Sequence, residues 1–130
     1  MTRRRDIACA LALTVLIGVP GVVPASSAAR TSYVQASARE FYYGLSRPSV
    51  RPGPVRFEMV NFGEDDHDLA ISRKGGTTIA QLGIVKPGDR GTVEARLRRG
   101  SYVLWCTISD HKARGMRAVL KVRAARKKRR

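Results

Sequence analysis

The segment WCTISDHKARGM, residues 105–116, places a cysteine, a histidine and a methionine at even spacing. These are Cys106, His111 and Met116, and the only other histidine of the chain is His67. Taken singly, a histidine or a methionine more often packs in a core or on a surface than binds a metal. As a set, two imidazoles, a thiolate and a thioether match the donors of a blue-copper site, where methionine is the weak axial contact. Zinc would more often take a second cysteine or a carboxylate.

The N-terminal sequence determines how the cysteine is interpreted. Residues 1–29 begin with arginines, continue with an apolar run and end in small residues, which is the layout of a secretory signal peptide. An uncleaved membrane anchor is the alternative, although the apolar run is short for a spanning helix. Cleavage removes Cys9 and leaves Cys106 as a single thiol, so the exported chain can form no internal disulfide. Cys106 is then either a metal-binding thiolate or an inert core thiol beside Trp105.

Short stretches of alternating apolar and polar residues fill the body of the chain and predict β-strands. Turn-forming glycine, proline, asparagine and aspartate residues separate these stretches. The pattern is clearest in residues 55–59, 69–71, 93–97, 102–106 and 118–122. Residues 77–85 leave a strand and an irregular turn both open. Short strands at this spacing predict a single all-β domain, an antiparallel sandwich or barrel.

This pattern places the four candidate ligands at the ends of predicted elements. Cys106 ends one strand, His111 lies in the following loop, and Met116 lies at the start of the last strand. His67 opens another strand, after a turn. In a Greek-key sandwich, a strand end and a distant loop can meet at one end of the barrel. Met59 instead belongs to an alternating strand face, so we expect it to pack in the core.

The charge of the chain is strongly positive and is concentrated at its C-terminal end. The formal net charge is +15, and six of the last eight residues, RAARKKRR, are cationic. We expect residues 123–130 to be a disordered basic tail, because like charges repel and nothing there can be buried. Such a tail can contact an anionic surface or lipid. Export argues against a specific nucleic-acid partner inside the cell.

Three segments of the sequence resemble the cupredoxins, the small blue copper proteins of the plastocyanin, azurin and auracyanin type. They are VNFGEDDHDLAI (60–71), KPGDRGTV (86–93) and GSYVLWCTISDHKARGMRAVLKV (100–122). The last one follows the family's order of glycine and tyrosine before the cysteine, then histidine, then Gly-Met before a final apolar strand. The resemblance covers about residues 33–122, with its N-terminal third fitted by the strand pattern alone, and predicts a cupredoxin-like domain over residues 30–122. It implies a cupredoxin-like Greek-key β-sandwich, with one type 1 copper ion as the cofactor.

The resemblance also implies the site and its role. The equatorial copper ligands would be His67, Cys106 and His111, with Met116 as the axial ligand. The chain would be a one-electron carrier rather than an enzyme, and the edge of His111 would be the usual exit for the electron. Basic residues around the ligand loop, Lys112 among them, would suit a redox partner with an acidic docking face. We expect a monomer, located in the periplasm, outside the cell or at its surface.

Two features depart from the pattern of the family. Asp68 stands directly after the first histidine, where the family often has asparagine. Its carboxylate could accept a hydrogen bond from Thr107, the residue after the cysteine, and its charge would lower the reduction potential. The second departure is the acidic run of residues 64–66, Glu-Asp-Asp, directly before His67. An ordinary solvated turn is the favoured interpretation, and a set of oxygen ligands for the metal is the alternative.

Two other classes of function stay open at this point. A copper chaperone or storage protein would bind the metal without redox turnover, and the acidic run would favour that class. A metal-free adhesive sandwich, attached to anionic surfaces by the basic tail, would not need Cys106 or His111 at all. The sequence favours the electron carrier because all four donors of a blue-copper site are present in order.

Overall fold

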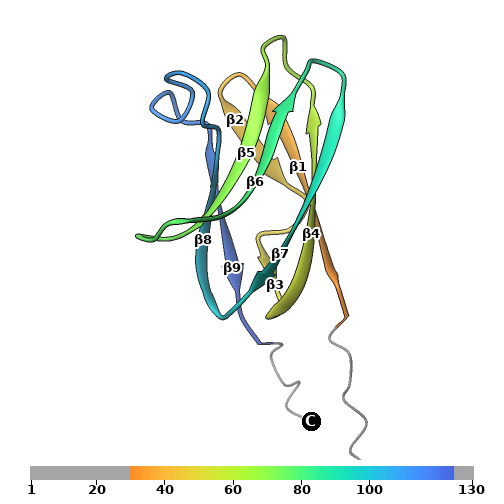
Figure 1. Cartoon of the computed structure of the whole chain (residues 1–130), viewed down its shortest axis with the longest axis vertical. Helices are drawn as coiled ribbons and strands as arrows, with labels where there is room; N and C mark the ends of the chain where they lie inside the picture. The colour runs from red at the N-terminus through yellow and green to blue at the C-terminus, as the bar shows by residue number, and fades with distance from the viewer. Residues whose placement is uncertain (1–29, 125–130) are drawn as a thin grey trace, which may run out of the picture.

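The computed structural model describes residues 30–124, which form β-strands and no helix (Figure 1). The strands are β1 (Ser32–Arg39), β2 (Tyr42–Leu45), β3 (Ser49–Val50), β4 (Gly53–Asn61), β5 (His67–Arg73), β6 (Thr78–Val85), β7 (Arg90–Leu97), β8 (Gly100–Trp105) and β9 (Arg117–Val122). The prediction of an all-β domain is confirmed. Residues 77–85, left open between a strand and a turn, are almost entirely strand β6. The predicted signal peptide and residues 125–130 of the predicted tail lie outside the described residues.

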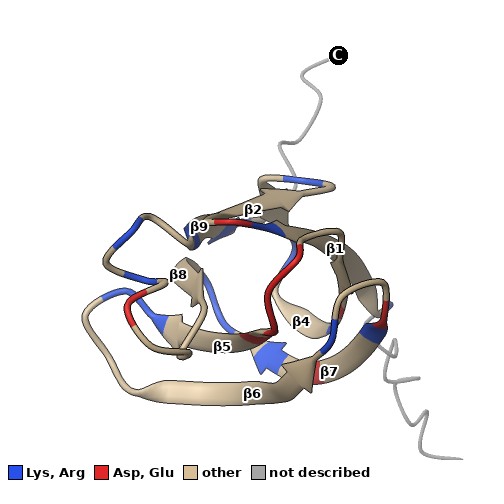
Figure 2. Ribbon diagram, turned by 90° about the horizontal axis from the view of Figure 1, so that it is seen from above, with Lys and Arg blue, Asp and Glu red and all other residues tan. Residues whose placement is uncertain are grey.

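The strands form two sheets that enclose one interior. One sheet has the order β2-β1-β4-β7 and the other has the order β3-β9-β8-β5-β6. Seen from one end, the two sheets face each other across the core (Figure 2). No helix within residues 30–124 is long and apolar enough to cross a membrane.

The predicted sandwich is present, but its sheets are mixed rather than antiparallel throughout. β1 runs parallel to β4 over seven residue pairs, from Ser32 with Val55 to Ala38 with Asn61. β3 runs parallel to β9 over two pairs. The other pairings are antiparallel. Both parallel pairs join strands that other strands separate in the sequence, and local alternation carries no signal for such pairing.

The core lies between the sheets and is built from the inward side chains of alternating strands. In β4, Val55, Phe57 and Met59 are fully buried, while Arg56 between them is exposed. Met59 is therefore a core residue, as expected. Each large apolar side chain buried in this way contributes about 1.5–3 kcal/mol to folding. β5 differs from β4 because residues 67–72 are all buried.

Predicted turns hold the strand ends in place. In the turn of residues 86–89, the Asp89 amide donates to the Lys86 carbonyl at 3.0 Å, and Gly88 has a φ of 81°. Proline followed by a glycine at positive φ is the signature of a type II turn.

The connections β1–β2, β4–β5 and β8–β9 all lie at one end of the sandwich (Figure 1). The beginning of β1 and the end of β9 lie at the opposite end. The fold therefore brings together segments that are far apart in the sequence. Two of them carry candidate ligands: the start of β5 has His67, and the β8–β9 connection has the other three.

Candidate metal centre

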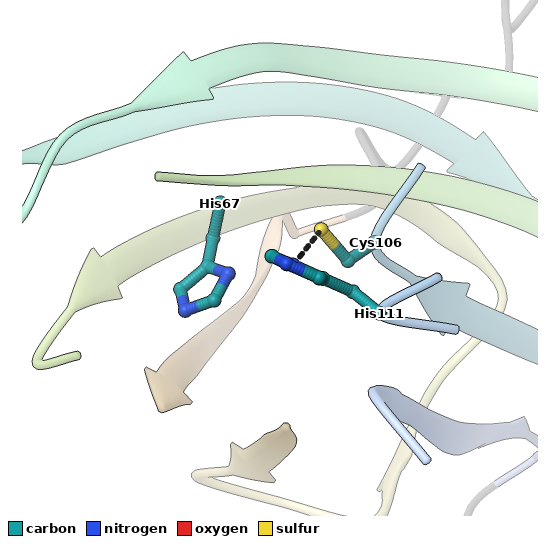
Figure 3. A group of neighbouring side chains, drawn as sticks. All are labelled: His67, Cys106 and His111. Carbon is teal, nitrogen blue, oxygen red and sulfur yellow. Dashed lines mark hydrogen bonds between the residues drawn. The ribbon is translucent and has the colours of Figure 1, made fainter. Parts of the chain in front are cut away.

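Three of the four predicted ligands converge at this end of the sandwich. His67 comes from the start of β5, Cys106 directly follows β8, and His111 lies in the β8–β9 loop. Their side chains point toward one another (Figure 3). One donor atom from each residue lies within 4.8 Å of the others, and the distance from Cys106 Sγ to His111 Nδ1 is 3.6 Å.

The β8–β9 loop closes on itself and brings its end back to Cys106. The His111 carbonyl accepts the Met116 amide at 2.9 Å, and the Met116 carbonyl accepts the Cys106 amide at 3.2 Å. Gly115 has a φ of 110°, a conformation that glycine adopts without the steric cost of a side chain. Cys106, His111 and Met116 are therefore evenly spaced in the sequence because they lie at the beginning, the middle and the end of one compact loop.

Met116 is fully buried at the end of this loop. Its backbone is hydrogen-bonded to both Cys106 and His111, so its place beside them is fixed by the chain. The role of these four residues as ligands stays a prediction, and the structure shows that the fold gathers them at one place.

The centre is closed to solvent. His67 and Cys106 are fully buried, and His111 is only 7% exposed. Burial raises the pKa of the Cys106 thiol, because an isolated thiolate is poorly solvated there. A cation beside the sulfur would reverse this preference and favour the thiolate. The site therefore favours a charged sulfur only when a positive charge is present.

The nitrogen atoms of His67 have very different surroundings. Nε2 lies 3.0 Å from the carboxylate oxygen Oε1 of Glu40. Nδ1 is buried and has no hydrogen-bond partner among the described residues. A buried polar atom without a partner is costly unless something binds it. His67 Nδ1 faces a thiol and a second imidazole. Its unshared electron pair can therefore bind a soft or borderline metal ion, and the set of donors fits copper.

The predicted contact between Asp68 and Thr107 is present. Asp68 Oδ1 accepts the Thr107 amide at 2.6 Å, and Oδ2 accepts the Thr107 hydroxyl. The Tyr43 hydroxyl donates to the Asp68 carbonyl from the other sheet. These bonds tie the residue after His67 to the residue after Cys106, so the two ligand-bearing segments are fastened to each other.

The acidic run before His67 forms an exposed turn. Glu64, Asp65 and Asp66 are all exposed, and none belongs to the group of converging donors in the described chain. Asn61 holds the turn: its side-chain amide donates to the carbonyls of Asp65 and Val85 at 2.8 and 2.9 Å. The structure favours the solvated turn over direct ligation by these carboxylates.

Two residues beside the centre escaped the sequence analysis. Glu40 and Phe41 lie between β1 and β2, far from any motif. The Phe41 ring packs edge-on against His111 with the centroids 4.8 Å apart, and the Arg114 guanidinium lies 3.5 Å from the centroid of Phe41. Phe41 therefore covers part of the His111 ring, which is 7% exposed. No local signal marks either residue, because each reaches the site only through the fold.

In sequence, no family model and no curated protein matches the chain. Among solved structures, the fold is similar to an azurin (Az-iso2) from Methylomonas sp. strain J, with a TM-score of 0.59, 15% identity and coverage of 72% of this chain and 98% of the azurin. Auracyanin from Roseiflexus castenholzii gives a TM-score of 0.57 at 19% identity, with coverage of 75% and 99%. Rusticyanin from Thiobacillus ferrooxidans gives 0.59 at 21% identity, with coverage of 72% and 77%. These similarities show that the chain has the cupredoxin fold.

Proposed function

We propose that this chain is a cupredoxin that carries single electrons, with one type 1 copper ion held by the two histidines, the cysteine and the methionine described above. The observation that supports this most strongly is the buried group of His67, Cys106 and His111 at the end of a cupredoxin fold. Bound copper would supply a one-electron change between Cu(II) and Cu(I).

The surrounding residues keep the donors in nearly fixed positions. Hydrogen bonds close the β8–β9 loop, and the Asp68–Thr107 contact joins it to β5. A site that moves little between two charge states needs little reorganisation when an electron arrives or leaves. Burial of Cys106 also keeps water and oxidants away from the thiol.

We propose that the chain transforms no substrate. Both of its histidines belong to the donor group, so neither is free to serve as a general base. A copper chaperone would use the same donors but would release the metal. Two measurements distinguish the carrier from the chaperone. A reversible couple in protein-film voltammetry, together with fast electron self-exchange in solution measured by NMR, supports the carrier. Copper that passes readily to an acceptor protein, without a stable couple, would support the chaperone instead.

For the redox partner, we propose a protein with an acidic docking face. Lys112 and Arg114 are exposed in the β8–β9 loop. Arg114 covers Phe41, which in turn packs on His111, so a partner seated on this loop would lie close to the centre. Complementary charge of this kind speeds association at low salt.

Charge reversal tests this docking proposal. Lys112→Glu combined with Arg114→Glu should slow electron transfer to an acidic partner at low ionic strength, and salt should reduce the difference from the wild type. Lys121→Glu combined with Arg123→Glu is the matched control, because both residues are exposed at the end of β9, which lies at the opposite end of the sandwich. Equal rates for the two charge-reversed variants would count against the proposed face.

We further propose that the protein is exported as a monomer, with residues 1–29 removed and the basic tail free to contact anionic surfaces. The signal-like sequence of residues 1–29 supports export. N-terminal sequencing of the exported protein tests the cleavage, and an N-terminus that retains the arginines would contradict it.

A further inference from the structure

The carboxylate of Glu40 lies beneath the acidic turn and on the outer side of His67. Its Oε1 atom accepts the amides of Glu64 and Asp65 at 2.7 and 3.0 Å. The same oxygen lies 3.0 Å from His67 Nε2. One oxygen of Glu40 therefore binds the turn that leads into β5 and the first residue of β5.

These contacts decide which nitrogen of His67 carries the proton. Two backbone amides donate to the same oxygen of Glu40, and hydrogen bonds of this kind favour the ionised carboxylate. An ionised carboxylate can only accept hydrogen bonds, so Nε2 of His67 must be the donor. In the neutral imidazole Nδ1 then keeps a free electron pair. Figure 3 shows that this nitrogen is turned toward Cys106 and His111.

The neighbouring backbone is shaped to admit the carboxylate. A Cβ atom at Gly63 would lie 2.0 Å from Glu40 Oε1, far inside any allowed contact. Gly63 in turn donates its amide to the side chain of Asn61 at 2.9 Å, which fixes the turn. A side chain at this position would have to displace the Glu40 carboxylate, so glycine allows the acidic group to approach the backbone closely.

We propose that Glu40 is a positioning residue for the metal centre: its carboxylate holds His67 with Nδ1 directed at the other donors, and its negative charge favours Cu(II) over Cu(I). The part of this inference that concerns copper and its reduction potential rests on the proposed function. Glu40, which lies outside the ligand segments, would thus influence the reduction potential through its contact with His67.

The size of the effect follows from the behaviour of similar carboxylate–histidine pairs. Loss of the partner of a metal-bound histidine typically weakens metal binding by about 10–100-fold. If Cu(II) loses about tenfold more affinity than Cu(I), the one-electron potential rises by about 59 mV. Removal of the Glu40 charge should therefore raise the potential measurably while both oxidation states still bind.

The test compares three variants of the full chain. Glu40→Gln keeps an acceptor oxygen for the amides and His67 but removes the charge, and Glu40→Ala removes both. Asp66→Asn is the matched control, because it removes an exposed charge next to His67 in sequence without removing the contact to Nε2. The measurements are the nitrogen chemical shifts of His67 in the metal-free protein, the affinity for Cu(II) and the midpoint potential.

We expect the metal-free wild type and Glu40→Gln to show His67 protonated at Nε2, and Glu40→Ala to show a mixture of tautomers. Glu40→Gln should raise the potential by about the amount of a tenfold change in relative affinity, and Asp66→Asn should not. Glu40→Ala should bind Cu(II) about 10–100-fold more weakly than the wild type.

The proposal would be overturned if Glu40→Gln were less stable than the wild type but had the same midpoint potential as Asp66→Asn. Glu40 would then only support the turn. Wild-type His67 protonated at Nδ1 would overturn it without any use of copper. If the wild type binds no copper, the proposed function fails, and the tautomer measurement still decides the structural part of this inference.

Discussion

The contact between Asp68 and Thr107 should contribute measurably to stability even without metal. Asp68 is 4% exposed and accepts two hydrogen bonds from Thr107, one from the amide and one from the hydroxyl. A hydrogen bond to a charged group contributes about 1.5–3 kcal/mol. Because Thr107 itself is exposed, the lower end of this range applies to each bond. The perturbation is a double-mutant cycle of Asp68→Ala and Thr107→Val.

The expected free energies follow from counting the bonds that each change removes. Thr107→Val removes the hydroxyl bond and should lower the free energy of unfolding by about 1.5 kcal/mol. Asp68→Ala removes both bonds to Thr107 and a long bond of 3.4 Å from the Gln81 amide, which is weak at that distance, so it should lower the free energy of unfolding by about 3 kcal/mol. In the double variant the hydroxyl bond is already lost, so the total should stay near 3 kcal/mol, which gives a coupling of about 1.5 kcal/mol.

The assay is urea denaturation of the metal-free variants, followed by the fluorescence of Trp105, the single tryptophan of the chain. Thr77→Val, a change at an exposed threonine between β5 and β6, controls for the loss of a surface hydroxyl and should change stability by less than about 0.5 kcal/mol. If the effects of the two single changes simply add within about 0.5 kcal/mol, the contact does not join the two ligand segments energetically.

Asp68→Asn extends the same cycle to the copper form. The amide keeps the shape and one acceptor oxygen but removes the negative charge near the centre. The reduction potential should therefore rise, because a nearby anion stabilises Cu(II) more than Cu(I). Voltammetry at one salt concentration measures the shift, and an unchanged potential would remove Asp68 from the list of groups that influence the metal.

Two further changes test the packing around the centre and the core beneath it. Gly63→Ala should displace the Glu40 carboxylate and weaken Cu(II) binding. Gly83→Ala, at a β6 position with open space around it, should leave Cu(II) binding unchanged. Equal Cu(II) affinities of the two variants would contradict the close fit of Glu40 against Gly63. Phe57→Ala should lower the free energy of unfolding by about 3–5 kcal/mol, because the ring is fully buried. Ile84→Ala, 65% exposed, should change it by less than about 0.5 kcal/mol in the same denaturation assay, and similar losses for both would contradict the assignment of the core.

The sequence was most informative where the chemistry is local. Cys106, His111 and Met116 lie in one compact loop, so their types and spacing alone indicated a metal centre. The middle of strand β4 was equally clear, because Val55, Phe57 and Met59 are buried while Arg56 between them is exposed. The Asp68 contact was also predictable, since the resemblance placed it next to a ligand.

The rest depends on contacts between distant parts of the chain. Glu40 reaches His67 across 27 residues, and nothing in the sequence around it distinguishes it from an ordinary surface acid. The parallel pairing of β1 with β4 leaves no trace in either strand, because alternation reports burial and not the identity of the neighbour. β6 was ambiguous because Ile79 and Ile84 are exposed, which obscures its alternation.

The most direct test of the account is the visible absorption spectrum of the metal-free protein as Cu(II) is added, recorded beside Cys106→Ser. The account predicts an intense blue thiolate-to-copper band that saturates at one copper per chain and is missing in the variant. A band of the same intensity in Cys106→Ser, or no band in either protein, would contradict the assignment of His67, Cys106 and His111 as the copper centre.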